Sequence, residues 1–404
     1  LGLPCALAVE SKGHSVIGYD ISETVQETVK SKKLPYKEIW AQDHLDNSNI
    51  EIKSVEDVVS HSEIIFVPIQ TPHDEKYEGI TRIPDDRVDF NYEWLKAGIK
   101  TLSDEIEKQG EDKVVIIIST VLPGTIEREI KPLLGSHTKL CYNPFFIAMG
   151  TTMRDFMNPE YVLFGVDDDE AAEKAQSLYS SIHDRPFYKT TIKNAELIKV
   201  AYNTFIGMKI VYANTMMEVC HKIGADVDAV TGAMSLATER LISGKYLSGG
   251  MGDGGGCHPR DNIALSWLSN KLNLSYDWFD NIMKQRELQT DWFADLIEDN
   301  LLEGGIVILG KSFKPETNIE TGSPAHLLAN ILKERGHTFV HYDPLVDTYK
   351  ISVDTPRTFF IGTKHDDFVN FNFPKGSIII DPWRYIPDKK DCKVIQIGNR
   401  TNEL

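Results

Sequence analysis

Short apolar runs that alternate with helical stretches constrain the fold of this chain most strongly. Strands that are apolar throughout are typical of parallel sheets whose two faces are covered by helices. Such runs lie at 15–20, 64–68, 114–118, 161–165, 305–310, 337–343, 377–381 and 393–398. We therefore predict an α/β protein with two Rossmann-like domains, each built on a parallel sheet.

A long helical pattern separates the two series of strands. Apolar and aromatic residues recur at helical spacing over 193–223, and Gly224 suits the end of a helix. A helix of this length suits a spine between two lobes or a dimer interface. We predict three domains, namely a Rossmann domain at 1–190, a helical central and dimerisation domain at 191–298, and a second Rossmann-like domain at 299–404.

Charge and cysteine content exclude several classes of protein. The 404-residue chain carries a formal net charge of −17, which argues against a nucleic-acid partner, because such proteins usually present a basic face. Its five cysteines include no CxxC pair, which favours a reducing compartment and argues against a zinc site, so no metal is predicted. No apolar run reaches about 18 residues and no secretory leader is visible, so we expect a cytoplasmic protein that does not cross a membrane.

The first twenty residues are similar to the second part of a dinucleotide-binding motif. In that motif a strand runs into GxGxxG and a helix, and an acid about 20 residues further on binds the ribose hydroxyls. Gly2 would be the third glycine and Asp20 the acid, while the first strand is absent, so we interpret the chain as N-terminally incomplete. An acid at this position repels a 2′-phosphate, which favours NAD over NADP. An amphipathic helix followed by a buried strand explains the segment equally well.

A glycine-rich segment at 252–261 ends in a cysteine and an acid. Glycines such as Gly254 let the backbone approach a ligand closely, and Cys257 is a potential nucleophile once deprotonated. Arg260 is a nearby cation, and Asp261 could orient a water molecule or a base. A surface loop with an incidental cysteine is the alternative interpretation.

Two polar residues on the long helix share one face. Lys199 and Asn203 are four residues apart and have apolar neighbours. Together they could donate hydrogen bonds to an oxyanion. A polar stripe on an amphipathic helix explains them as well.

Three loops follow predicted strands, where ligands contact α/β sheets. Thr71 and Thr120 each follow an apolar run, although each could instead be a helix cap or a turn residue. The loop at 310–318 contains Phe313, Lys314 and a second lysine, and could hold an anion or simply be a solvated basic loop. It lacks the GxxxxGK[ST] spacing, so a Walker P-loop is excluded.

Taken in order along the chain, these segments resemble the UDP-glucose/GDP-mannose dehydrogenase family. The matching words are GLP…GHSVIGYD, STVLPGT, NPEYVLFG, AELIKVAYNTF, GADVDAV, GGGCHPRD, GKSFKPET…SP and YDP. The resemblance implies an NAD-binding domain, a helical dimer spine containing the cysteine loop, and a second Rossmann-like domain that holds the nucleotide of the substrate. It implies oxidation of the C6 hydroxyl of a nucleotide sugar, such as UDP-glucose, to the uronate with NAD, in a homodimer or higher oligomer.

The resemblance also implies a role for each matching residue. Cys257 matches the nucleophile that forms the thiohemiacetal and the thioester, and Lys199 and Asn203 match the residues that stabilise the oxyanion. Asp261 matches the acid that helps to activate water, and Thr120 matches a residue of the water site. The implied cofactor contacts are Gly2, Asp20, Thr71, Thr120 and Arg260. The implied substrate contacts are Lys199, Asn203, Arg240, Gly254, Phe313 and Lys314. Of these, Arg240 would reach the substrate of the neighbouring subunit.

The sequence departs from the family pattern at several positions. The family segment PEFLxEG has two glutamates, and here Phe145 and Met149 replace them. Thr321 replaces an arginine, and Arg260 replaces a lysine, which keeps the charge but changes its shape. Because Phe145 cannot accept a proton, hydrolysis of the thioester is in question. The alternatives are an enzyme that stops after one oxidation or stalls at the thioester, and an inactive homologue that binds nucleotide sugars.

Overall fold

The computed structural model describes residues 1–399 apart from 73, 83, 168, 240, 242–245, 247 and 275–276. The chain divides into two compact units. Unit 1 contains 1–72 and 90–201, and unit 2 contains 73–89 and 202–404. The three-domain division made from the sequence stays a prediction, because here the helical region and the C-terminal lobe fall into one unit.

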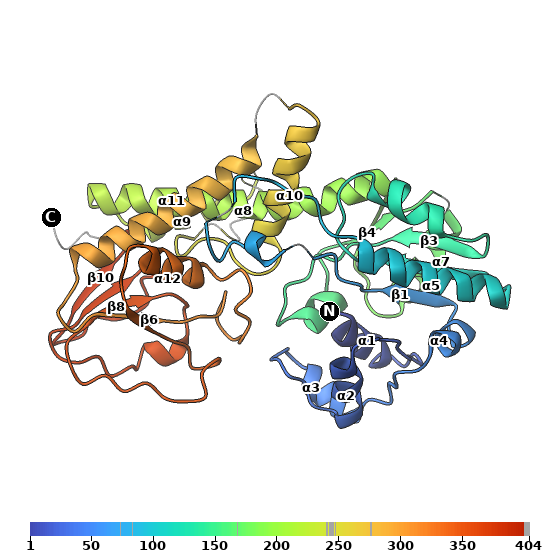
Figure 1. The fold of residues 1–404 in the computed structure, drawn as a ribbon, viewed down its shortest axis with the longest axis horizontal. Coiled ribbons are helices and arrows are strands. Elements are labelled where there is room, and N and C mark those ends of the chain that lie inside the picture. Colours follow the sequence, from blue (N-terminus) through green and yellow to red (C-terminus); the bar gives the residue numbers. More distant parts are fainter. Residues whose placement is uncertain are drawn as a thin grey trace. The chain divides into compact units, whose positions relative to one another are not determined.

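Unit 1 is built on a five-stranded sheet in the order β1-β2-β3-β4-β5 (Figure 1). Strands β1, β2 and β3 are parallel, β4 and β5 are parallel, and β3 meets β4 in antiparallel fashion at Tyr142 and Gly165. The strands are β1 (Ile64–Val67), β2 (Lys113–Ile117), β3 (Thr138–Tyr142), β4 (Val162–Gly165) and β5 (Phe187–Thr190). The predicted parallel sheet is therefore confirmed, with one antiparallel junction.

The helices of unit 1 cover this sheet and its edges. They are α1 (Gly2–Glu10), α2 (Glu23–Ser31), α3 (Ala41–Asn47), α4 (Val55–His61), α5 (Glu93–Gln109), α6 (Thr152–Met157) and α7 (Asp169–Ser180), with short turns η2 (Ile126–Ile130) and η3 (Lys131–Leu133). Side chains of α1 and α7 pack with Val114 and Ile116 of β2 in one buried core. Strand β2 is buried at every position, as its apolar residues 114–117 predict, and its first residue Lys113 is buried as well.

One predicted strand of unit 1 does not form. Over 15–20 only Gly18 makes a bridge, opposite Ile52. Its N–H donates to the Glu51 carbonyl at 3.0 Å and its own carbonyl accepts from Lys53 N–H at 2.7 Å. A strand needs a longer ladder than this single exchange. The prediction of a strand at 15–20 was therefore wrong, because only this one bridge forms.

Helix α8 (Ile192–Ile223) is the long helix that the sequence predicts. It belongs to unit 1 up to residue 201 and to unit 2 from residue 202. It ends at Gly224, whose φ of +74° is readily adopted only by glycine, so the predicted helix end is confirmed.

Unit 2 contains a helical part and a second five-stranded sheet. The helical elements are η1 (Glu75–Tyr77), α9 (Val227–Ser235), α10 (His258–Lys271) and α11 (Trp278–Asp299). The sheet has the order β10-β9-β8-β6-β7 and is parallel throughout. Its strands are β6 (Ile306–Leu309), β7 (Phe339–Tyr342), β8 (Thr358–Ile361), β9 (Ile378–Asp381) and β10 (Lys393–Gln396), with the turn η4 (Asp366–Phe368) between β8 and β9.

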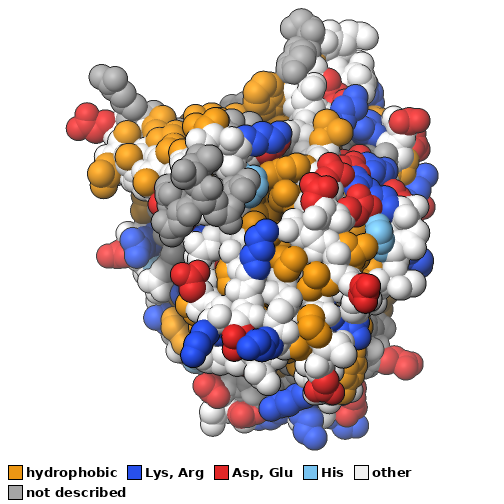
Figure 2. All heavy atoms as spheres, turned by 90° about the vertical axis from the view of Figure 1, so that its left-hand side faces the viewer, with side chains coloured by type: hydrophobic (Ala, Val, Ile, Leu, Met, Phe, Trp, Pro, Cys, Tyr) orange, Lys and Arg blue, Asp and Glu red, His pale blue; other side chains and the backbone are white. Residues whose placement is uncertain are grey.

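Helix α12 (Pro324–Glu334) lies against this second sheet (Figure 1). Leu327, Leu328 and Ile331 join Ile308 and Phe360 in its buried core. Ser323 caps the start of this helix, because its Oγ accepts a hydrogen bond from Ala325 N–H at 3.2 Å. On the face of the molecule in Figure 2, acidic and basic side chains are interspersed. Within the described residues, no helix has the length and apolar character needed to cross a bilayer.

Candidate active site

Cys257 lies at the start of a helix in unit 2. It is the N-cap of α10, and Pro259 occupies the first turn, where proline is well accommodated. The thiol is only partly buried, whereas Cys5, Cys141 and Cys220 are buried. The positive end of the helix dipole favours negative charge at such a position. Cys257 is therefore a partly exposed cysteine at the N-terminal end of a helix.

Three residues named from the sequence meet at the first turn of α10, which follows this cysteine. Asn203 Nδ2 donates to Asp261 Oδ2 at 2.6 Å, and Arg260 Nε lies 3.3 Å from Asp261 Oδ1. Asp261 is fully buried and Asn203 nearly so. The ring of His258 also reaches this group, since its Nδ1 lies 3.2 Å from the Asn203 carbonyl oxygen. The structure thus brings together a carboxylate and an amide that lie 58 residues apart in the sequence.

The cysteine loop packs closely against the loop that carries Phe313. A Cβ atom on Gly254 would lie 3.2 Å from Phe313 Cβ, and one on Gly255 would lie 3.0 Å from Phe313 Cε2. Gly322 approaches even more closely, because a Cβ there would lie 2.3 Å from the Gly255 carbonyl oxygen. These glycines are required by close backbone approach, so the two segments form one surface within unit 2.

The other residues that the sequence analysis linked to the substrate differ in their exposure and surroundings. Lys314 is partly buried, with its Nζ 5.5 Å from the centroid of the Phe313 ring. Thr321, which replaces the usual arginine, is exposed beside the cysteine loop, 3.8 Å from the Cβ position of Gly256. Arg240 lies outside the described residues.

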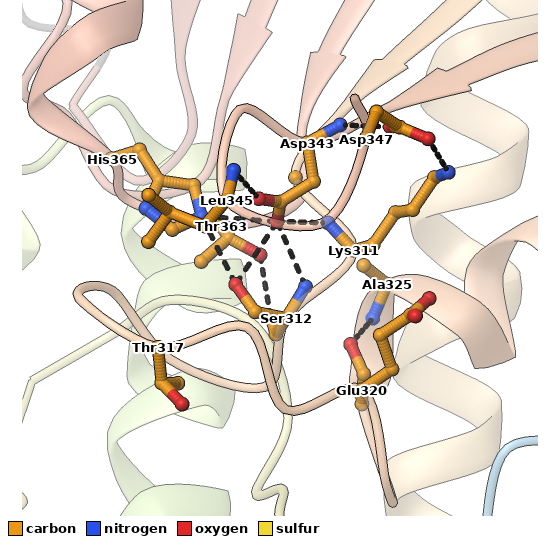
Figure 3. A network of polar contacts seen from close by, with 12 residues as sticks. Lys311, Ser312, Thr317, Glu320, Ala325, Asp343, Leu345, Asp347, Thr363 and His365 are labelled. Carbon is orange, nitrogen blue, oxygen red and sulfur yellow. Dashed lines mark hydrogen bonds and ion pairs between the residues drawn. The ribbon is translucent and has the colours of Figure 1, made fainter. Parts of the chain in front are cut away.

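A buried aspartate holds the start of the Phe313 loop (Figure 3). Asp343 follows β7 and its Oδ2 accepts from the N–H groups of Lys311 at 2.7 Å and Ser312 at 3.0 Å. The Ser312 hydroxyl and His365 Nε2 each lie 3.0 Å from the same oxygen. Burial opposes ionisation of Asp343, but the hydrogen bonds from His365 and the two backbone N–H groups outweigh it and hold the pKa of Asp343 below its usual range.

Sequence reasoning missed Arg286, which is almost completely buried below the cysteine loop. Its Nε lies 3.0 Å from Asp253 Oδ1, and burial, opposed by this partner, lowers its pKa. A signal was present in the sequence, because Arg286 shares the apolar face of α11 with Ile282, Phe293 and Ile297. A charge within an apolar stripe requires a partner, and that requirement could have identified it.

In unit 1, the two predicted threonines lie at the carboxyl ends of neighbouring strands. Thr71 Oγ1 donates to the Thr120 carbonyl oxygen at 2.7 Å, so the structure brings them together. Thr71 is buried and Thr120 is partly exposed. Glu196 of α8, which the sequence analysis left out, accepts from Gly124 N–H at 2.5 Å and Ile126 N–H at 2.8 Å and so fixes the loop after Thr120.

Lys199 faces the segment in which the family's glutamates are missing. Its Nζ lies 5.2 Å from the centroid of the Phe146 ring, a cation–π arrangement. Phe145 is buried against Phe156 at a centroid distance of 5.4 Å, and Met149 is exposed. The glutamate positions therefore hold a core side chain and a surface side chain, and neither can transfer a proton.

The start of unit 1 fits a dinucleotide. A Cβ on Gly2 would lie 2.8 Å from Pro68 Cγ, so α1 packs as closely against the end of β1 as the third glycine of the motif requires. Asp20 follows the Gly18 bridge and Asp20 Oδ1 accepts from Ser22 N–H at 2.8 Å, which leaves Asp20 Oδ2 available for a ribose hydroxyl. The roles predicted from the sequence for both residues stay predictions.

These features define a dehydrogenase-type α/β protein with a cysteine at a helix N-terminus. Residues 1–183 match the NAD binding domain of the UDP-glucose/GDP-mannose dehydrogenase family, and residues 193–286 match its central domain. The chain belongs to this family of NAD-dependent nucleotide-sugar dehydrogenases.

Individual relatives agree with this assignment. The chain is 26% identical to a UDP-glucose 6-dehydrogenase of Bacillus subtilis over 359 residues, which covers 85% of this chain and 74% of the relative. It is 24% identical to a GDP-mannose 6-dehydrogenase of Pseudomonas putida, over 100% of this chain and 90% of the relative. Its fold is similar to a UDP-glucose dehydrogenase structure from Pyrobaculum islandicum, with a TM-score of 0.86, 23% identity and coverage of 98% and 95%.

Proposed function

We propose that this protein oxidises the C6 hydroxyl of a UDP-glucose-like nucleotide sugar to the uronate through a thioester on Cys257. The observation that carries the proposal is the partly exposed Cys257 thiol at the start of α10, next to the buried Asn203–Asp261 pair. NAD, when bound, accepts the hydride. Capture of the aldehyde by a thiolate keeps the reactive intermediate from solvent.

Residues of α8, α10 and the Phe313 loop would supply the other functions that this chemistry needs. Lys199 and Asn203 lie one turn apart on α8, and both are donors for the oxyanion that forms when the sulfur attacks a carbonyl. Asp261 is held by Asn203 and Arg260, and it can orient the water that hydrolyses the thioester. Phe313 and Lys314 belong to the loop that, in this proposal, binds the nucleotide part of the substrate.

The test is NAD reduction with a panel of UDP- and GDP-sugars. We expect two NADH per sugar consumed and complete loss of turnover in Cys257→Ala. Cys392→Ala is the matched control, because Cys392 is also a partly buried cysteine of unit 2 but lies just before β10 of the second sheet. The absence of NADH with every sugar of the panel would contradict the proposal.

Phe145 and Met149 favour a second candidate, in which oxidation stops early. With no acid at either position, Asp261 is the only one of the proposed catalytic residues that can activate the water that hydrolyses the thioester. This candidate predicts one NADH per sugar, or a sugar adduct on Cys257 that intact-mass spectrometry detects. Binding of a nucleotide sugar without any NADH would instead indicate an inactive homologue.

We also propose a homodimer through α8. Leu197, Phe205 and Tyr212 recur along one side of this helix and are 48%, 43% and 44% exposed. Large apolar side chains in such a row are typical of an interface. Sedimentation of the full chain should give at least twice the monomer mass, and Phe205→Glu should shift it towards the monomer.

A further inference from the structure

A segment of the first half of the chain is built into unit 2 beside the cysteine loop. This crossover segment, residues 73–89, leaves unit 1 after Pro72 and returns at Phe90. Arg82 holds it to α11 through two hydrogen bonds to Asp291, of 2.8 and 2.6 Å, and Asn330 Nδ2 of α12 donates to the Ile80 carbonyl oxygen at 2.6 Å.

The crossover segment also contributes apolar contacts. Tyr77 is buried in a cluster with Ile263 of α10 and Met283 of α11, and Val88 packs against the same cluster. Arg87 forms an ion pair with Asp280 of α11. The described residues Tyr77, Arg87 and Val88 therefore attach the segment to α10, which follows the cysteine loop, and to α11.

Gly79 brings the crossover segment within two residues of Cys257. Its φ of +74° is in the left-handed region, and a Cβ there would lie 3.0 Å from Pro259 Cβ and 3.3 Å from a terminal nitrogen of Arg286. Only glycine satisfies both the backbone angle and the space. The segment therefore contacts the first turn of α10 directly.

Arg286 connects the crossover segment to both loops of the site. Its guanidinium donates to the Asp253 carbonyl oxygen at 3.1 Å, to the Gly79 carbonyl oxygen at 2.7 Å and to the Gly322 carbonyl oxygen at 3.4 Å. It also forms the buried ion pair with the Asp253 side chain. One side chain therefore joins the crossover segment, the cysteine loop and the start of α12.

The stability of the fold does not require an arginine at position 286. A buried ion pair gains little over well-packed apolar side chains, because both charges lose their hydration. What a guanidinium adds is geometry, since its planar donors fix several acceptors at once. A lysine in this place has the charge but cannot reach three carbonyl oxygens in one plane.

We propose that Arg286 and the crossover segment form a brace that positions Cys257 for reaction. Arg286 is a positioning residue, because it acts on the cysteine through Asp253, Gly79 and Pro259. The inference rests on the proposed function for its catalytic consequence, although the geometry of the brace does not depend on that function.

The experiment compares Arg286→Lys and Gly79→Ala with the control Arg357→Lys, an arginine of unit 2 that the brace does not include. At a temperature where circular dichroism shows each variant to be folded, we expect kcat to fall about 10- to 100-fold in the two brace variants. The KM for NAD should stay unchanged, because the residues assigned to NAD are almost all in unit 1. A merely destabilised enzyme would lose active fraction in proportion to its loss of folded signal.

A second measurement is independent of turnover. Alkylation of Cys257 by iodoacetamide, followed by peptide mass spectrometry without substrate or NAD, should speed up several-fold in both brace variants and not in the control. If Arg286→Lys does not fold, Asn330→Ala, which removes only the bond to Ile80, should show the same direction. Wild-type alkylation rates in all folded brace variants would overturn the proposal that the brace positions Cys257. An active Cys257→Ala would overturn the proposed function and leave the alkylation result to decide on the brace.

Discussion

His341 should make the C-terminal lobe lose stability in mild acid. The residue lies on β7, its Nε2 donates to the Gly310 carbonyl oxygen at 2.8 Å, and its ring contacts the His326 ring at a centroid distance of 5.1 Å. Burial lowers the pKa of His341 to about 4, from an ordinary value of 6.5. Burial disfavours the charged imidazolium, so the folded lobe takes up this proton later than the unfolded chain.

The sign and size of the effect follow from these two pKa values. Above pH 6.5 the ring is neutral in both states, and its contribution to stability is fully present. As the pH falls from 6.5 towards 4, only the unfolded chain binds the proton, so the folded lobe loses stability. At about pH 4.5 the loss amounts to about 2.5 kcal/mol, since each pKa unit corresponds to about 1.4 kcal/mol.

The matched variant is His341→Gln, which can still donate to the Gly310 carbonyl but does not titrate. Hydrogen exchange of the β6 and β7 amides is the suitable assay, because a chain with two units need not unfold in one step. Between about pH 7.5 and pH 4.5, the ratio of wild-type to variant protection should fall roughly 70-fold. A ratio that does not change with pH would refute the assignment of a neutral ring at His341.

Two further substitutions, one of them with a control, test the close approach of Gly322 to the cysteine loop and the cofactor site. Gly322→Ala should cost about 2–4 kcal/mol and reduce activity, because its Cβ would meet the Gly255 carbonyl oxygen at 2.3 Å at a φ of +64°. The control is Gly336→Ala, where φ is +86° but the Cβ would meet open space, and it should cost only about 1 kcal/mol of stability. Thermal unfolding and kcat are measured for both variants. Asp20→Ala should raise the KM for NAD roughly tenfold with kcat nearly unchanged, because one hydrogen bond to a charged group is lost. An unchanged KM would place the ribose elsewhere.

Much of the site could be predicted from the sequence because its parts are local. Cys257 and the residues after it lie on one helical turn, and Lys199 and Asn203 lie one turn apart on α8. Continuous apolar runs predicted β2, β6 and β9 because those strands are largely buried. The strands that the sequence missed, β3 and β5, have polar or half-exposed residues and carry no such signal.

The sequence by itself determined the family and the alternation of buried strands with helices, because both depend on neighbouring residues, and it also named the reactive groups that we propose. Only the tertiary structure showed that Arg286 bonds to Gly79, 207 residues away, and that Asp343 holds the loop before Phe313. Hydrogen bonds to backbone carbonyl and N–H groups leave no mark on the residue types of the acceptor segments. Such contacts are therefore decided by how the chain packs, because every residue type offers the same backbone groups.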